Sequence, residues 1–167
     1  MKIRLETPQD GNAIEQITIA AFAGKSYSDQ TEHLIVDRLR KAGAMFVSLV
    51  ADIDGKIVGH VAFSVVTING EDKGWYGLGP VSVLPELQKQ GIGSKLIREG
   101  LSLIREQGAQ GCVLEGSPVY YQRFGFKPYR GLIYEGSPAP EYFMALPFFE
   151  DVPEGKVEFH SAFYTGS

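Results

Sequence analysis

The chain has 167 residues, of which 44% are hydrophobic and 22% are charged, and this is enough for one domain with a sizeable core over residues 1–167. The formal net charge of -4 and the pI near 5.4 argue against a broad phosphate-binding surface, so nucleic acid is not an expected partner. A single cysteine, Cys112, excludes an internal disulfide framework and leaves no cluster with zinc-ligand spacing, so we expect a reducing compartment and no metal site.

The chain opens with MKIRLETPQD, which has no apolar stretch of signal-peptide length, and no later segment approaches the roughly 20 apolar residues that span a bilayer. We therefore expect a cytoplasmic protein with no membrane partner. Residues 3–6 are typical of a short strand. Residues 7–22 predict a helix, with Thr7 as its cap and Pro8 in its first turn. A second helix is predicted by Ile35, Leu39 and Ala42 at helical spacing.

Residues 46–70 are dense in β-branched and aromatic side chains and predict two antiparallel strands, joined by a turn at Asp54-Gly55. Residues 74–85, GWYGLGPVSVLP, predict a further strand with Gly79-Pro80 in its middle. Because proline cannot donate to a sheet ladder, this strand needs a bulge or a locally splayed edge at that point. We expect a gap in the sheet there.

A strand–helix–strand unit is predicted to follow. Residues 111–115, GCVLE, indicate a buried strand that should run parallel to the strand at 74–85. A short helix begins at Ser117, and residues 141–148 and 156–163 predict late strands. The helix between the two parallel strands shows a stripe of small and apolar residues at Gly93, Leu96, Ile97, Gly100, Leu101 and Ile104.

Two glycines stand where the strand at 74–85 gives way to this helix, in the segment QKQGIG from Gln88 to Gly93. Glycine lets the backbone approach a ligand closely, and the free N–H groups of a first helical turn favour phosphates. The segment lacks both the spacing of a Walker A loop and the third glycine of the dinucleotide fingerprint, which disfavours a nucleotide-binding protein. A plain turn before a helix, which Gly91 alone would explain, is the alternative interpretation.

The spacing of Gln88, Gly91 and Gly93 resembles the Gln-x-x-Gly-x-Gly signature of the GNAT acetyltransferase superfamily. A second motif, Tyr121 with Gly125 and Phe126, is similar to that family's Tyr-x-x-x-Gly-Phe segment. The resemblance covers residues 1 to about 130. It implies an α/β chain with the GNAT fold: a central, mixed, mostly antiparallel sheet with helices on both faces and a splayed pair of parallel strands.

The resemblance also implies acetyl-CoA as the cosubstrate. Its pantetheine arm would pair with the backbone of Val81, Ser82 and Val83, and an N–H of Val81 or Val83 would stabilise the oxyanion that develops during acyl transfer. Backbone N–H groups at the glycine turn would bind the pyrophosphate, with Lys89 or Lys95 adding charge. The predicted phosphate-binding residues are Gln88, Lys89, Gln90, Gly91, Ile92, Gly93, Ser94 and Lys95.

Two residues are predicted to carry the chemistry. Tyr121 occupies the family's position for the group that stabilises or protonates the leaving thiolate, with simple packing as its alternative role. Its neighbour Tyr120 is expected to pack. Glu115 is the candidate general base, and a solvated carboxylate at the end of a strand is an equal alternative. His60 is more typical of a partly buried structural histidine, whereas His160 has no assigned role.

The acceptor would enter opposite coenzyme A, near segments that carry Tyr27, Trp75, Tyr76, Tyr134 and Glu135. Aromatics and carboxylates suit a cationic amine, although a capped edge of the core would have the same composition. The sequence therefore predicts an N-acetyltransferase that acts by direct attack of a primary amine of a small molecule or peptide. The alternative is a non-catalytic acyl-CoA-binding or regulatory module. Residues 141–148 are a candidate homodimer interface, or they simply complete the sheet.

Overall fold

The computed structural model describes residues 1–164 and begins with a strand and two helices. Strand β1 (Lys2–Leu5) leads through a 3-10 turn (Pro8–Asp10) into α1 (Gly11–Phe22), and α2 (Glu32–Lys41) follows after a loop. The carboxylate of Asp10 accepts hydrogen bonds from the backbone N–H and hydroxyl of Thr7, at 2.7 and 3.1 Å. Thr7 therefore precedes a 3-10 turn, and the α-helix begins later than the sequence pattern predicted.

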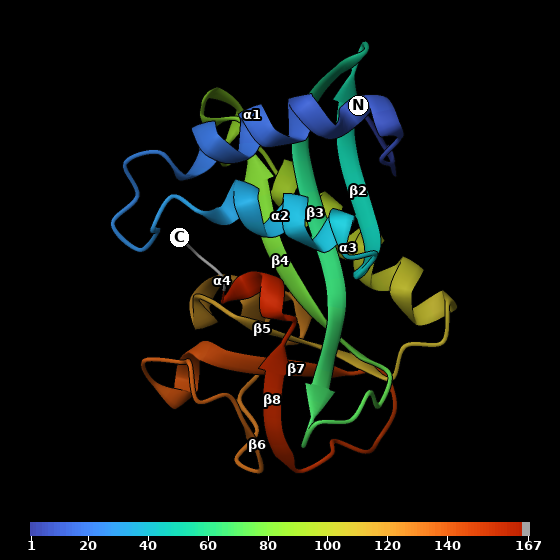
Figure 1. Cartoon of the computed structure of the whole chain (residues 1–167), viewed down its shortest axis with the longest axis vertical. Coiled ribbons are helices and arrows are strands. Elements are labelled where there is room, and N and C mark those ends of the chain that lie inside the picture. Colours follow the sequence, from blue (N-terminus) through green and yellow to red (C-terminus); the bar gives the residue numbers. More distant parts are fainter. Residues whose placement is uncertain (165–167) are drawn as a thin grey trace.

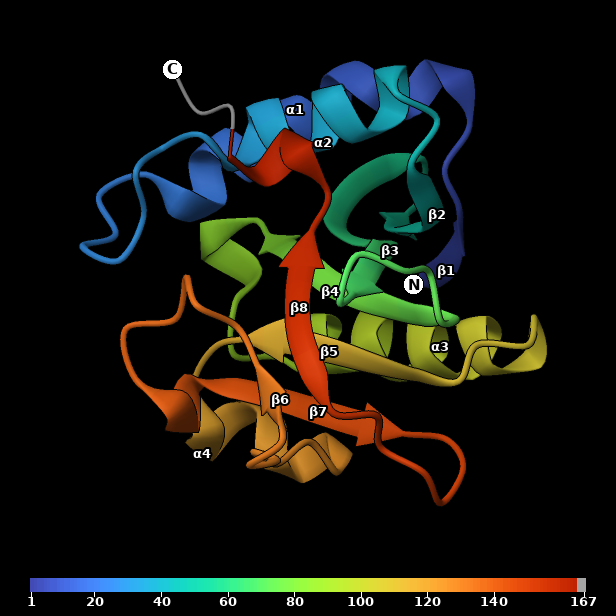
Figure 2. The same cartoon turned by 60° about the horizontal axis from the view of Figure 1, so that its bottom comes forward.

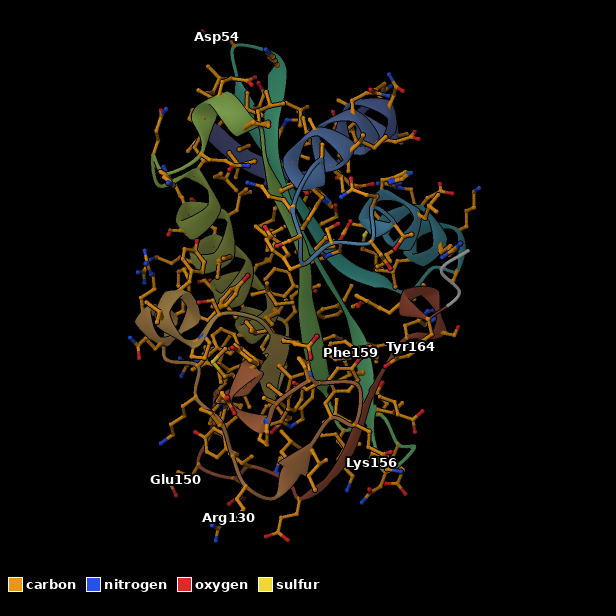
Figure 3. All side chains as sticks on the ribbon, turned by 90° about the vertical axis from the view of Figure 1, so that its left-hand side faces the viewer. Asp54, Arg130, Glu150, Lys156, Phe159 and Tyr164 are labelled. Carbon is orange, nitrogen blue, oxygen red and sulfur yellow. The ribbon has the colours of Figure 1, made fainter. Side chains whose placement is uncertain are left out.

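The centre of the fold is one mixed sheet with the strand order β1-β2-β3-β4-β5-β7. Along this path all neighbours are antiparallel except β4 and β5, which are parallel, as predicted from the strand–helix–strand unit. The turn at Asp54-Gly55 joins β2 and β3 into a hairpin, also as predicted, and Figure 3 shows Asp54 at one end of the molecule. These strands are β2 (Met45–Ile53), β3 (Lys56–Ile68), β4 (Trp75–Val83), β5 (Gly111–Glu115) and β7 (Phe143–Pro147).

Helices cover both faces of the sheet, with α1 and α2 on one side and α3 (Ile92–Glu106) on the other (Figure 1). The predicted stripe of α3 is buried, and Leu96, Ile97 and Ile104 are fully enclosed against β2, β3 and β5. On the other face Ile14 and Val36 pack on the sheet. Cys112 lies in the core beneath α3, as expected for a small apolar residue.

The late part of the chain adds a second, smaller layer of strands. A short helix, α4 (Pro118–Tyr121), is followed by β6 (Leu132–Ile133), which the sequence pattern did not predict, and by β8 (Gly155–Phe159). Strand β8 pairs with the far end of β3 and with β6 (Figure 2). The strand predicted at 156–163 ends at Phe159, because Nδ1 of His160 accepts the N–H of Ala162 at 3.0 Å and starts a 3-10 turn.

The sheet opens where Gly79-Pro80 interrupts β4. Val61 of β3 pairs with Val81 of β4, and Phe63 pairs with Leu78. Between these two pairs β3 advances by two residues and β4 by three, so β4 has a bulge there. The bulge includes Gly79-Pro80, whose peptide bond is cis. The pairing of β4 with β5 runs only from Trp75 to Gly77. Beyond Gly77 the two parallel strands separate, which confirms the predicted gap.

Candidate active site

The separated part of β4 presents a row of backbone groups toward the gap. The N–H of Leu84 donates to the carbonyl of Val58 on β3, at 3.0 Å. Because alternate residues of a strand face opposite neighbours, the N–H of Ser82 also faces β3, whereas those of Val81 and Val83 point away from it. No strand of residues 1–164 pairs with β4 on that side after Gly77. Val81 and Val83, the two predicted oxyanion donors, therefore face the gap.

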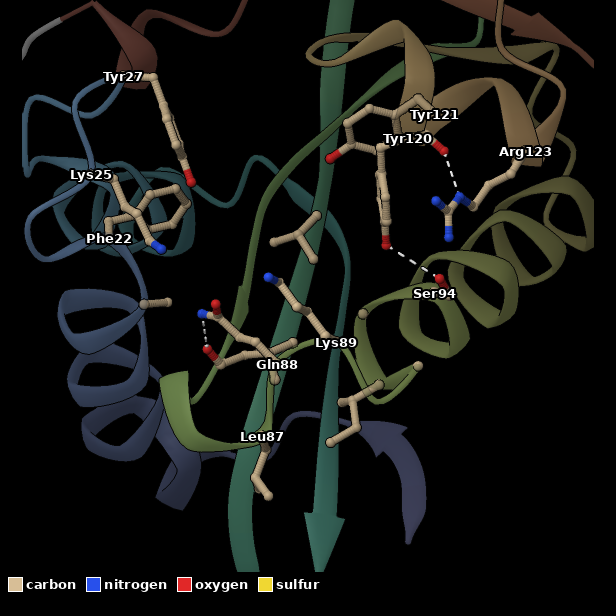
Figure 4. A pocket seen from close by; sticks show the side chains of 16 residues that line it. Phe22, Lys25, Tyr27, Leu87, Gln88, Lys89, Ser94, Tyr120, Tyr121 and Arg123 are labelled. Carbon is tan, nitrogen blue, oxygen red and sulfur yellow. Dashed lines mark hydrogen bonds between the residues drawn. The ribbon is translucent and has the colours of Figure 1, made fainter.

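Gln88 has a defined task at the end of this strand. Its side-chain amide donates to the carbonyl of Val83 at 3.0 Å (Figure 4). This contact satisfies an otherwise open carbonyl and ties the glycine turn to β4. The side chain of Ser82 lies on the opposite face, where its hydroxyl donates to Thr18 at 3.3 Å.

The glycine turn holds two residues in the left-handed region, Lys89 at φ 65° and Gly91 at φ 88°. Gly91 precedes α3, and its carbonyl accepts the N–H of Lys95 at 3.0 Å as the first helical hydrogen bond. The N–H groups of Ile92, Gly93 and Ser94 come before that bond and have no partner within the helix. They form the positive end of a helix of 15 residues, which is a suitable site for a phosphate.

A cavity of about 660 Å³ joins the open edge of β4 to this helix start. Most of the predicted acetyl-CoA residues line it, but Ser82, Gln90 and Lys95 do not. Lys95 is exposed on the first turn of α3, so the cationic side chain that reaches the cavity from the glycine turn is Lys89. The lining residues are Ala21, Phe22, Lys25, Tyr27, Val81, Val83, Leu87, Gln88, Lys89, Gly91, Ile92, Gly93, Ser94, Tyr120, Tyr121 and Arg123.

Tyr121 turns its hydroxyl into the cavity, whereas the hydroxyl of Tyr120 points to the start of α3 (Figure 4). Tyr121 is half-buried, and its ring packs edge-on against Tyr120 and Phe126. Burial raises the pKa of the Tyr121 phenol above its ordinary value, and the phenols of Tyr120 and Tyr27 raise it further. The group therefore stays protonated and can donate a hydrogen bond at any working pH.

Tyr120 does more than the packing that the sequence analysis assigned to it. Its hydroxyl lies 3.3 Å from the hydroxyl of Ser94 on the first turn of α3. The guanidinium of Arg123 stacks over its ring at 4.4 Å, and Arg123 Nε donates to its carbonyl at 2.9 Å. Arg123, which the sequence analysis did not single out, is thereby held at the cavity wall beside the helix start. The one sequence signal that could have identified Arg123 is its position between Tyr121 and Phe126 of the second motif.

Glu115, the candidate base, is exposed at the end of β5 and is not part of the cavity wall. Of the predicted acceptor residues only Tyr27 lines the cavity. Trp75 is 2% exposed and packs in the core under β8, so it does not face an acceptor. Tyr76 stacks on Phe46 instead. Tyr134 packs against Phe143 and Phe159, and Glu135 forms a surface ion pair with Lys156.

The charges at the cavity wall are all positive. Lys25, Lys89 and Arg123 line it, and no aspartate, glutamate or histidine does. None of the three takes part in an ion pair with another of residues 1–164. In the same part of the chain no group of three histidine, cysteine or acidic side chains is placed to hold a metal ion. The cavity is therefore suited to an anionic ligand.

A second polar group lies buried beneath α1 and α2. Ser48 contacts both the carboxylate of Glu6 and Nε2 of His60, the latter at 2.7 Å, and Arg40 forms a two-pronged ion pair with Glu6. Because the carboxylate only accepts, the Ser48 hydroxyl donates to Glu6 and accepts the Nε2–H of His60. His60 is completely buried, not partly as expected, and its Nδ1 has no partner among the described residues.

Comparison with known proteins agrees with this geometry. A family model described as an acetyltransferase (GNAT) domain matches residues 44–128. This stretch includes the open edge of β4, the glycine turn and Tyr121. The chain belongs to the GNAT family of acetyltransferases.

Named relatives of this GNAT protein come from Escherichia coli K12. The uncharacterized N-acetyltransferase YhbS is 38% identical over 128 residues, which cover 76% of this chain and 74% of YhbS. The uncharacterized N-acetyltransferase YjhQ is 35% identical over 133 residues, or 78% of this chain and 71% of that protein.

Solved structures extend the similarity to the whole fold. A GNAT family acetyltransferase from Brucella melitensis, crystallised in complex with acetyl-CoA, has a TM-score of 0.87 and 54% identity over 97% of both chains. The structure of E. coli YhbS in complex with CoA has a TM-score of 0.91 and 31% identity, covering 99% of this chain and 93% of that one. The predicted GNAT fold, with its mixed sheet and parallel pair, is confirmed. No helix within residues 1–164 has the length and apolarity needed to cross a membrane.

Proposed function

We propose that this GNAT protein transfers the acetyl group of acetyl-CoA to a primary amine by direct attack, with the reaction at the gap between β4 and β5. The observation that carries the proposal is the cavity itself, which joins the phosphate-binding start of α3, the free edge of β4 and the Tyr121 hydroxyl. The complexes of its relatives with acetyl-CoA and CoA support the same assignment.

The phosphates of acetyl-CoA fit the helix start. The N–H groups of Ile92, Gly93 and Ser94 would receive the pyrophosphate, and Lys89 and Arg123 would neutralise the remaining charge. Gly93 leaves the room that this needs, because a Cβ built there would stand in the cavity, 3.5 Å from the Tyr120 hydroxyl. No residue of the cavity wall carries a negative charge that would oppose the phosphates.

The acetyl carbonyl would be positioned by β4. An N–H of Val81 or Val83 faces the gap and would donate to the carbonyl oxygen as negative charge develops on it. In the transfer the amine nitrogen bonds to the carbonyl carbon, the carbon–sulfur bond breaks, and the sulfur leaves as a thiolate. The amine loses one proton, and the thiolate gains one.

Tyr121 would stabilise the leaving thiolate. A thiol ordinarily has a pKa of about 8.5, whereas burial holds the pKa of the Tyr121 phenol above its own ordinary value. Complete transfer of the phenolic proton to sulfur would therefore be uphill, and the main contribution of Tyr121 is a hydrogen bond to the developing thiolate. The final proton of the thiol then comes from water.

The proton of the amine would leave by way of water. No carboxylate lines the cavity to stabilise a bound ammonium ion, which favours the neutral, nucleophilic form of the amine. Glu115 lies outside the wall, so a role as general base requires an intervening water. Replacing Glu115 with Gln tests this role: an unchanged pH profile of kcat/KM would leave Glu115 as a surface carboxylate.

The decisive experiment compares wild-type protein with Tyr121→Phe. We expect the release of CoA in the presence of an amine panel to fall about 100-fold in kcat, with little change in the Kd for acetyl-CoA. Equal kcat values would refute the assignment of Tyr121. If the wild type binds acetyl-CoA but acetylates no amine or peptide, the chain is instead a non-catalytic acyl-CoA-binding module.

A further inference from the structure

The end of α1 and the turn after it place three side chains on one side of the cavity. Figure 4 shows Phe22, Lys25 and Tyr27 there, across from Ser94 and Tyr120 at the start of α3. The helix start and Arg123 lie on the α3 side, and Lys89 stands between the two sides (Figure 4). Phe22, Lys25 and Tyr27 therefore face the part of the cavity that remains for the acceptor. We call these three residues the α1 wall.

The turn that carries the α1 wall is held by its own hydrogen bonds. The N–H of Lys25 donates to the Phe22 carbonyl and the N–H of Ser28 donates to the Lys25 carbonyl, each at 3.1 Å. The side chain of Gln30 donates to the Phe22 carbonyl at 2.7 Å. These hydrogen bonds support the backbone that carries Lys25 and Tyr27.

Lys25 has no anionic partner in residues 1–164, although one carboxylate belongs to the same loop and another to the start of α2. Asp29 accepts the N–H and hydroxyl of Thr31, and Glu32 accepts the hydroxyl of Ser28. Neither carboxylate lines the cavity. The ammonium of Lys25 is therefore available to an anionic group of a ligand.

Tyr27 supplies an uncovered aromatic surface beside that ammonium. Its side chain is 77% exposed, and its ring meets Phe22 edge-on with the centroids 6.5 Å apart. An exposed aromatic ring at a cavity offers a surface on which an apolar group of a ligand can pack. Tyr27 and Tyr121 line the same cavity, so a ligand held by the α1 wall would share that cavity with the Tyr121 hydroxyl.

A cationic acceptor would find no counter-charge at this site. Polyamines, aminoglycosides and lysine side chains would each place a positive group beside Lys25, with no carboxylate of the wall to pair with it. An amine that also carries a carboxylate would instead gain a charge-assisted hydrogen bond from Lys25. Of the residues that the sequence offered for an acceptor, only Tyr27 lines the cavity, and Glu135, the one carboxylate among them, lies outside it.

We propose that the acceptor is an amino carboxylic acid with an apolar or aromatic side chain, whose carboxylate binds Lys25 and whose side chain packs on Phe22 and Tyr27. The proposal rests on the acetyltransferase function above and names its substrate class. Lys25 is a specificity-determining residue in this arrangement, and it takes no part in the bond-forming step.

Matched pairs of amines test the proposal in a CoA-release assay at saturating acetyl-CoA. Each pair compares an amino acid with its decarboxylated amine: phenylalanine with phenethylamine, leucine with isoamylamine and tryptophan with tryptamine, and spermidine serves as a polycation. We expect wild-type kcat/KM to favour the acid of at least one pair by about 10- to 100-fold. Lys25→Ala should remove this preference, and Lys25→Glu should invert it. Preference for spermidine or for the decarboxylated amines would overturn the proposal.

Two controls separate this proposal from the function on which it rests. Lys56→Ala removes an exposed lysine at the start of β3 and should leave every value unchanged. The Kd for acetyl-CoA should be the same in wild type and Lys25→Ala, since a parallel loss would show that Lys25 serves the phosphates instead. N-acetylphenylalanine, titrated into CoA-loaded protein, reports the site without turnover. Binding that depends on Lys25 would uphold the substrate class even if transfer failed, whereas no binding would refute it.

Discussion

At the scale of single residues, the position of the Tyr121 ring depends on a glycine that it touches. A Cβ added to Gly116, just after β5, would lie 2.6 Å from Cε2 of Tyr121. The absent side chain thus makes room for the Tyr121 ring, and the ring position sets where the hydroxyl enters the cavity. Nothing in the local sequence pattern distinguishes this glycine from one that only allows a turn.

Replacing Gly116 with Ala should push the Tyr121 ring away and lower kcat about 10- to 100-fold, because small displacements of a reacting group are costly. The Kd for acetyl-CoA should stay within about twofold, since the start of α3 is untouched. Steady-state kinetics together with isothermal titration separate the two effects.

Gly136→Ala is the matched control, because a Cβ at Gly136 would crowd a different tyrosine, Tyr134, at 2.5 Å. Neither Gly136 nor Tyr134 lines the cavity. A loss of kcat in Gly136→Ala as large as that in Gly116→Ala would mean that general destabilisation, and not the position of Tyr121, is being measured.

At the scale of elements, the start of α3 is set by backbone conformation more than by packing. Gly91 has φ 88°, and an added Cβ would find no atom within 4 Å. Substitution there costs energy only because side chains other than glycine disfavour the left-handed region, by about 1 kcal/mol. The turn that precedes α3 can therefore be perturbed without disturbing the core.

Gly91→Ala should lower the free energy of unfolding by about 1 kcal/mol and raise the Kd for acetyl-CoA about tenfold, since the N–H groups of the helix start lose their alignment. Gly55→Ala offers a close match, because Gly55 also has φ 88° and open space, at the tip of the β2–β3 hairpin. It should lose similar stability in urea denaturation and none of the affinity. A shared loss of affinity would contradict the role of the glycine turn.

At the scale of the whole molecule, the buried group around His60 makes stability depend on pH. Burial lowers the pKa of His60 from 6.5 to about 4, with Arg40 lowering it further and Glu6 opposing the shift. The unfolded chain binds a proton near pH 6.5 while the folded chain does not. The contribution of neutral His60 is therefore complete above pH 6.5 and is lost as the pH falls toward 4.

We expect the free energy of unfolding to drop by up to about 3 kcal/mol between pH 7 and pH 4. We assign the loss of stability in the upper half of this pH range to His60. Glu6 and Asp10 both have lowered pKa values, and Arg4 lowers the pKa of Asp10 to about 2, so protonation of these carboxylates destabilises the fold only at lower pH. Urea denaturation of His60→Gln should show a flatter slope between pH 6.5 and 5. A slope in His60→Gln as steep as that of the wild type would assign the effect to other groups.

Much of the fold could be predicted because its signals are local. The turn at Asp54-Gly55, the break at Gly79-Pro80 and the stripe of α3 each depend on residues within a few positions of one another. The prediction failed where long-range pairing decides the outcome. Strand β6 has only two residues and forms because β8 lies beside it, and Trp75 is drawn into the core that β8 covers.

The sequence by itself determined the family motifs, the glycine turn and the position of Tyr121, because spacing along the chain dictates backbone conformation there. Only the tertiary structure decided which side chains surround the cavity. It turned Tyr121 into the cavity and Tyr120 toward α3, although they are neighbours, and it brought Lys25 from a distant loop to the cavity wall while leaving Glu115 outside. The physical reason is that the charge and shape of a cavity depend on packing between segments far apart in the chain.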